Sequence, residues 1–170
     1  TPDHVVQSHA ELQALHADTH MQVRRAHAFQ LTLREVFDGA APAERQKMLA
    51  AQLNLHGSVV RQAVVVREVL GVSLVDQIGW RSDEVALKRW RESVEGLGIF
   101  VFKAPFKQKD ISGFCLPADD FPLIYLNNST TKTRQTFSLL HELAHLLLNV
   151  AGISKFDTEY IRRLPASEQR

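Results

Sequence analysis

The chain has little of several features that mark particular protein classes. Its 170 residues include one cysteine, Cys115, so an intrachain disulfide is excluded. The setting of Cys115 within Ile111–Leu116 predicts a core position on a strand. No apolar run approaches the roughly 20 residues that a membrane-spanning helix requires, and no signal-peptide pattern opens the chain. Because 45% of the residues are hydrophobic and no repeat or low-complexity tract is present, we expect one domain or a domain with a helical extension.

The chain also lacks an excess of either charge. Twenty Lys and Arg face 19 Asp and Glu, interspersed along the sequence, for a net charge of +1. This balance gives no electrostatic reason to expect binding to nucleic acid or to an anionic membrane. A helix-turn-helix within residues 42–80 is the alternative, but Ser58–Leu70 offers only Arg61, Gln62 and Arg67 for DNA contacts. We therefore expect no direct nucleic-acid binding.

The first part of the chain is predicted to be helical. Apolar residues at spacings of three and four indicate a long amphipathic helix that ends at Asp38-Gly39. They are Leu12, Leu15, Val23, Ala26, Phe29, Leu33 and Phe37, with Thr19 in the one gap. A second helix is expected from Pro42 towards Gly57. We divide the chain into a helical N-terminal segment, residues 1–57, and a second domain, residues 58–170.

Two more helices are expected before any strand. Ser58 is the predicted cap of a segment to Leu70, which Gly71 closes. The stretch Ser82-Asp83-Glu84 begins another helix, which Gly96 ends.

Histidine is concentrated near the beginning of the chain, where His4, His9, His16, His20 and His27 lie. His16 and His20 are four residues apart, so a second metal site is one interpretation. No acidic residue stands in a ligand position beside them on that face. Solvated histidines on the polar face of the helix are the better interpretation.

The β-strand signal is confined to residues 97–127. Ile99–Phe102 is predicted to be a buried strand, and Ile111–Leu116 and Phe121–Leu126 are predicted strands. Pro117–Asp120 between the last two is typical of a hairpin turn. The pattern predicts an α+β fold with a small, mainly antiparallel sheet of three strands.

The most informative motif is His141-Glu142-Leu-Ala-His145, an HExxH sequence. Residues four apart lie on one face of an α-helix, so the two imidazoles can bind one zinc ion from the same side. Glu142 follows the first histidine directly, which is the position of a general base for the water at the fourth zinc coordination site. His141 and His145 are therefore the candidate metal ligands, and Glu142 is the candidate catalytic residue.

The motif lies in the strongest helical stretch, expected from about residue 131 to 149, which has no Gly or Pro and follows several capping residues. Its predicted apolar stripe is Phe137, Leu140, Ala144, Leu147 and Leu148, extended by Leu143 and Leu146. Two histidines and a glutamate are costly to bury on such a helix unless a metal satisfies them. The alternative is two core histidines hydrogen-bonded to the backbone beside an unrelated glutamate.

Several segments resemble the ImmA/IrrE family of bacterial metallopeptidases. The similarity is carried by Ile124-Tyr-Leu-Asn-Asn128 and by Arg134–Leu148, which contains the HExxH motif. It extends upstream through Arg67–Gly71, Gln77–Trp80, Ala86–Trp90 and Glu95–Phe102, so that it covers roughly residues 58–150.

This resemblance implies a zincin-like fold and a cytoplasmic, zinc-dependent peptidase. It also implies a partner, because family members are commonly encoded beside a helix-turn-helix repressor, which the best understood of them cleave to switch on stress or mobile-element genes. The family completes its metal site with a glutamate on a second helix, in a setting that this chain lacks. We expect the chain to be an excerpt of a longer protein whose third ligand lies beyond Arg170, with Glu168 as a weaker candidate.

The sequence thus predicts a zinc endopeptidase that cleaves a partner repressor. The alternative is a non-catalytic sensor or protein-interaction module that retains a metallopeptidase fold. An intact His-Glu-His motif favours catalysis.

Overall fold

The computed structural model describes residues 16–44, 53–54, 56–148 and 152–155. In chain order the elements are α2 (Ala17–Val36), α4 (Val59–Leu70), α5 (Leu74–Gly79), α6 (Asp83–Glu95), β1 (Phe100–Ala104), β2 (Ile111–Leu116), β3 (Leu123–Asn127), α7 (Lys132–Leu147) and β4 (Gly152–Lys155). The α+β fold class predicted from the sequence is confirmed.

The helix ends follow local sequence signals. After α2, Asp38 and Gly39 have positive φ angles of 50° and 73°, and α4 ends at Gly71 with a φ of 65°. Such left-handed conformations are least strained for glycine and comparatively tolerable for aspartate. At the start of α6, the Ser82 side chain accepts a hydrogen bond from the Val85 N–H at 3.3 Å. These three predicted boundaries are confirmed, whereas the helix expected from Pro42 towards Gly57 falls largely outside the described residues.

The sheet differs from the prediction in its pairing. Its order is β1-β3-β2-β4, so it has four strands among the described residues, and β4 follows α7 rather than preceding it. β2 and β3 form the predicted antiparallel hairpin, but β1 pairs with β3 in parallel, with Phe100 opposite Leu123. The sheet is therefore mixed, and the prediction of a small antiparallel sheet was wrong for β1. The physical reason is that after β1 the chain leaves the neighbouring position open and forms β2 one strand further along the sheet. The hairpin then places β3 between β1 and β2, parallel to β1.

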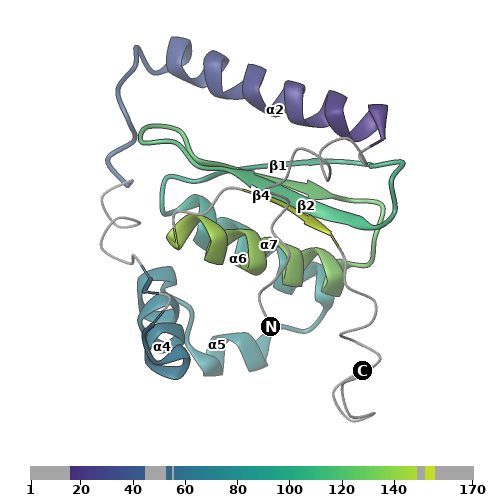
Figure 1. Ribbon diagram of the computed structural model, residues 1–170. Coiled ribbons are helices and arrows are strands. Elements are labelled where there is room, and N and C mark those ends of the chain that lie inside the picture. Colours follow the sequence, from purple (N-terminus) through teal and green to yellow (C-terminus); the bar gives the residue numbers. More distant parts are fainter. Residues whose placement is uncertain (1–15, 45–52, 55, 149–151, 156–170) are drawn as a thin grey trace.

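The sheet lies between two helical layers (Figure 1). α2 covers one face, and α6 and α7 cover the other. All five residues of the inner strand β3 are buried, and the four apolar ones, Leu123–Leu126, alternate between the two hydrophobic cores. Tyr125 packs under α2, while Ile124 and Leu126 pack under α7. Cys115 is only 1% exposed and belongs to the α7 side of the core, as predicted.

Polar contacts as well as apolar ones hold α2 against the sheet. Thr19, the gap in the predicted apolar stripe, is fully buried and donates its hydroxyl to Gln108 Oε1 at 2.8 Å. The Tyr125 hydroxyl donates to Gln22 Oε1 at 3.1 Å. His16, His20 and His27 are exposed, as expected for solvated histidines. Since α2 shares a core with β3, the two segments pack as one unit, and the domain division at residue 57 stays a prediction.

Among the residues that the structure describes, no helix is long and apolar enough to cross a bilayer.

Candidate active site

α7 carries both candidate metal ligands. It begins at Lys132, where the side chain of Thr131 accepts a hydrogen bond from the Arg134 N–H at 3.3 Å. Gln135 strengthens this end of the helix by donating its side-chain amide to the Thr130 carbonyl at 2.8 Å. Because no Gly or Pro interrupts the helix, its regular turn continues through residues 141–145.

The two histidine side chains meet on one face of α7. His141 Nε2 and His145 Nε2 are 3.0 Å apart, and the ring planes are nearly perpendicular at 80°. His145 is 8% exposed, so the pair lies at the edge of the core. The sequence predicted both imidazoles on one face within reach of a single ion, and the structure has them there.

This separation fits a metal site. In a tetrahedral zinc site with bonds of roughly 2.0–2.1 Å, two ligand nitrogens lie about 3.3 Å apart. The observed 3.0 Å requires only a small adjustment of either ring. Imidazole nitrogens are also among the donors that zinc prefers in proteins. The pair therefore fits zinc in both chemistry and spacing, while its role as a ligand set stays a prediction.

Glu142 lies beside this pair on the inner side of the helix. At 3.6 residues per turn it is about 100° round the helix from His141 and about 60° from His145. Its side chain is completely buried. A carboxylate in the core costs free energy that polar groups or a cation must compensate. A metal ion bound by the two histidines would offset the cost of burying the Glu142 carboxylate.

The apolar side of α7 anchors the site to the sheet. Leu139, Leu143 and Leu146 are at most 3% exposed and pack into the core with residues of α6 and β3. The predicted stripe was wrong at Phe137, which is 63% exposed. The reason is that the buried face is centred on Leu139 and Leu143, about a third of a turn away from the predicted stripe, so that Phe137 faces outward.

Asn127 organises the turn between β3 and α7. Its side chain is 1% exposed, and its Oδ1 atom accepts hydrogen bonds from Phe106 N at 3.2 Å, Ser129 N at 3.0 Å and Ser129 Oγ at 2.6 Å. Its Nδ2 atom donates to the Ile111 carbonyl at 2.9 Å. Sequence reasoning treated this residue only as one of several possible helix caps. The available signal was an asparagine at the end of a fully apolar strand, a position where its side chain can bond to turn backbone.

Positive charge gathers around the first turn of α7. Burial lowers the pKa of Lys103 on β1, and the charges of Arg91 and Lys132 lower it further. Burial also lowers the pKa of Arg134. Lys132 and Arg134 lie about two helical turns before His141 along α7. The electropositive end of the helix is therefore separate from the histidine pair.

A third protein ligand is not provided by the part of the chain that the structure describes. No group of three or more His, Cys, Asp or Glu side chains there could hold a metal ion. The nearest acidic residues after the motif in sequence, Asp157, Glu159 and Glu168, all lie outside the described residues. The expectation of a glutamate beyond Arg170 stays a prediction.

A histidine pair and a buried glutamate on one helix of an α+β fold are typical of metallopeptidases. Comparison with protein families agrees, because residues 94–170 match a peptidase family described as the IrrE N-terminal-like domain. This match supports the assignment to the ImmA/IrrE family that the sequence motifs predicted. Comparisons with curated proteins and with solved structures gave no match. The family match supports a function of the metallopeptidase type.

Proposed function

We propose that the protein is a zinc-dependent endopeptidase whose catalytic residue is Glu142. The observation that carries this proposal is the 3.0 Å approach of His141 Nε2 to His145 Nε2 on the helix that also contains Glu142. The match of this region to a peptidase family supports the same reaction class. His141 and His145 would hold the ion together with a third ligand, which the family resemblance implies is a glutamate.

When bound, zinc lowers the pKa of a coordinated water towards neutrality and polarises the substrate carbonyl. The chain itself supplies the proton transfer. Glu142 accepts a proton from the attacking water and then donates it to the leaving amine. Because the Glu142 side chain is buried, its carboxylate is shielded from bulk water. Its position on α7 fixes where the carboxylate lies relative to the two histidines.

For the substrate we propose a helix-turn-helix repressor encoded with the protein. The support is the family resemblance, in which cleavage of such a repressor releases stress or mobile-element genes. Cleavage in the cytoplasm follows from the same proposal, since a repressor acts there.

A second hypothesis is a non-catalytic interaction module. The observation that favours it is an exposed apolar surface on α4 and α5, where the exposed fractions of Val59, Val60, Val75 and Ile78 are 75–80%. Apolar surface of this kind is common at protein-binding sites. The two hypotheses differ in whether Glu142 is needed for the biological effect.

The test is cleavage of the co-encoded repressor by the full reading frame that contains these residues. Glu142→Gln preserves the size of the side chain but cannot accept the proton, so the cleavage rate should fall by roughly 10²–10⁴-fold. Glu35→Gln is the matched control, because Glu35 is an exposed glutamate on α2, on the other side of the sheet, and this variant should cleave at close to the wild-type rate. If Glu142→Gln cleaves as fast as wild type, the peptidase proposal is wrong and the interaction module takes its place.

A further inference from the structure

An aromatic side chain lies exposed next to the histidine pair. Phe137 stands one turn before His141 on α7, and the two rings stack with centroids 5.9 Å apart and planes inclined by 28°. Phe137 is 63% exposed, whereas Leu139 and Leu143 of the same helix are buried. Residues 133, 137, 141 and 145 form one stripe along the helix, since each is four residues from the next. Phe137 therefore extends the surface of the candidate active site along α7.

A cavity opens on the other side of Phe137. It has a volume of about 460 Å³ and lies between the first half of α7 and the segment where α5 meets α6. Its walls combine the apolar side chains of Trp80, Trp90, Phe137 and Leu140 with polar ones such as Gln77 and Arg81. This volume lies within the range of roughly 300–1,000 Å³ that is usual for small-molecule sites, so it can take a large side chain.

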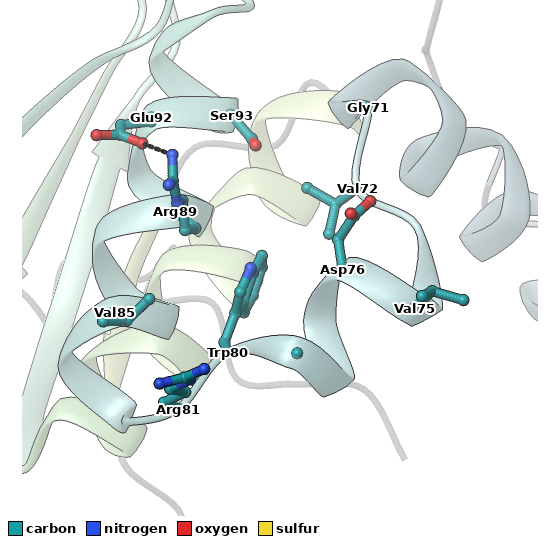
Figure 2. Close-up of a pocket in the computed structure, with 11 residues that line it drawn as sticks. Gly71, Val72, Val75, Asp76, Trp80, Arg81, Val85, Arg89, Glu92 and Ser93 are labelled. Carbon is teal, nitrogen blue, oxygen red and sulfur yellow. Dashed lines mark hydrogen bonds and ion pairs between the residues drawn. The ribbon is translucent and has the colours of Figure 1, made fainter.

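The walls of this cavity are fixed by contacts between elements. The rings of Trp80 and Trp90 meet edge to face, with planes at 90° and centroids 5.4 Å apart. Figure 2 shows Trp80 projecting between α5 and α6, where it also borders a neighbouring pocket. The Thr133 hydroxyl donates to Asp83 Oδ2 at 2.6 Å and ties the start of α7 to the start of α6. The cavity is therefore built by three helices rather than by a loop.

We propose that this cavity is a specificity pocket that receives a large aromatic side chain of the substrate beside the scissile bond. The proposal rests on the peptidase function proposed above. Phe137 contacts both the cavity and His141, so a peptide held at the histidine pair lies next to the cavity. Three aromatic rings in its walls favour an aromatic guest, because aromatic rings gain from edge-to-face and offset-stacked contacts beyond simple burial.

Binding can be measured without metal or cleavage. The chain contains two tryptophans, Trp80 and Trp90, and both line the cavity, so intrinsic fluorescence reports its occupancy. The probe is N-acetyl-L-phenylalanine amide, with the corresponding alanine and leucine amides for comparison, titrated into the metal-free protein. We expect a saturable change with the phenylalanine amide that is about fivefold to tenfold weaker in Phe137→Ala.

The matched control is Leu31→Ala on α2, a helical apolar residue of similar exposure, 60%, on the opposite side of the sheet. It should bind the phenylalanine amide like wild type. An alanine or leucine amide that binds as well as the phenylalanine amide would overturn the aromatic assignment. Equal binding by Phe137→Ala and Leu31→Ala would overturn the pocket itself.

Cleavage specificity supplies the second arm. With zinc added, a peptide series carries phenylalanine or alanine beside the scissile bond, and the ratio of the two kcat/KM values is measured. The ratio should favour phenylalanine in wild type and fall about tenfold in Phe137→Ala. If Phe137→Ala disturbed His141 and weakened zinc binding, both kcat/KM values would fall equally and their ratio would stay the same. A change in the ratio therefore reports a change in specificity and not a loss of metal.

The two proposals fail in different ways. If wild type cleaves the peptides but Phe137→Ala keeps the wild-type ratio, the specificity pocket is refuted and the peptidase function stands. If the phenylalanine amide binds but the zinc-loaded full reading frame cleaves no peptide, the peptidase function is refuted, and the substrate role of the pocket falls with it.

Discussion

Replacement of Asn127 by alanine tests how the turn before α7 is held. The Asn127 side chain makes four hydrogen bonds, three accepted by Oδ1 and one donated by Nδ2, while only 1% exposed. A typical intramolecular hydrogen bond contributes about 1 kcal/mol net, and a buried group that loses its partner costs about 1–3 kcal/mol. Water can reach the exposed Ser129 but not the buried Phe106 N–H, so we expect Asn127→Ala to lower the free energy of unfolding by roughly 3–4 kcal/mol.

The assay is urea denaturation followed by circular dichroism, compared at equal m-values. Asn128→Ala is the matched control, because Asn128 is exposed and bonds to Ala104 through its backbone N–H. The control should change the free energy of unfolding by at most about 0.5 kcal/mol. If the two variants differ by less than about 1 kcal/mol, the Asn127 network does not hold this turn and the reasoning fails.

Two further predictions concern the packing of α7 and the docking of α2. Leu143→Ala, at a residue only 1% exposed, should lower the free energy of unfolding by about 2–5 kcal/mol, whereas Leu31→Ala, at 60% exposure, should cost less than about 0.5 kcal/mol in the same denaturation assay. The Arg34 side chain donates hydrogen bonds to Asp120 at 2.7 and 3.1 Å and thereby lowers the pKa of that carboxyl. The stability gained from a lowered carboxyl pKa is present above the unfolded-state pKa and is lost as pH falls through the folded-state pKa. Arg34→Ala should therefore raise the Asp120 pKa towards its ordinary value in an NMR titration, and an unchanged pKa would refute the assignment.

Helix boundaries were predictable because their signals are local. Gly71 ends α4 with a left-handed conformation, and Ser82 caps α6, so single residues mark these ends. The short helix α5 was missed, although its signal was present in Ser73 and Asp76, which form a capping box. With six residues, α5 is too short to show helical periodicity.

Strand pairing was less predictable than strand position. The continuous apolar run of β3 indicates that both of its faces are buried, but it does not identify the neighbouring strands. The parallel partner β1 and the strand β4 are therefore set by the path of the chain through space, which periodicity does not encode. At Gly113 in β2 a side chain would meet the Tyr125 carbonyl at 2.8 Å, a close approach that becomes visible only once the strands are paired.

The candidate site was predictable to the extent that it lies within one helix. The spacing of His141 and His145 fixes their common face, and the structure has their Nε2 atoms 3.0 Å apart. The exposure of Phe137 and the bonding of Asn127 depend on which side of α7 meets the sheet. A third ligand depends on contacts between distant segments, for which the sequence offers no periodic signal.

The central claim is that His141 and His145 together bind one zinc ion and that Glu142 is not a ligand. Calorimetric zinc titration of the full reading frame tests it most directly, with His20→Ala as the control because His20 is an exposed histidine on α2. Wild type, His20→Ala and Glu142→Gln should each bind one zinc ion per chain, while His141→Ala and His145→Ala should lose at least about tenfold to a hundredfold in affinity. Zinc affinity that is unchanged in His141→Ala and His145→Ala would contradict the account.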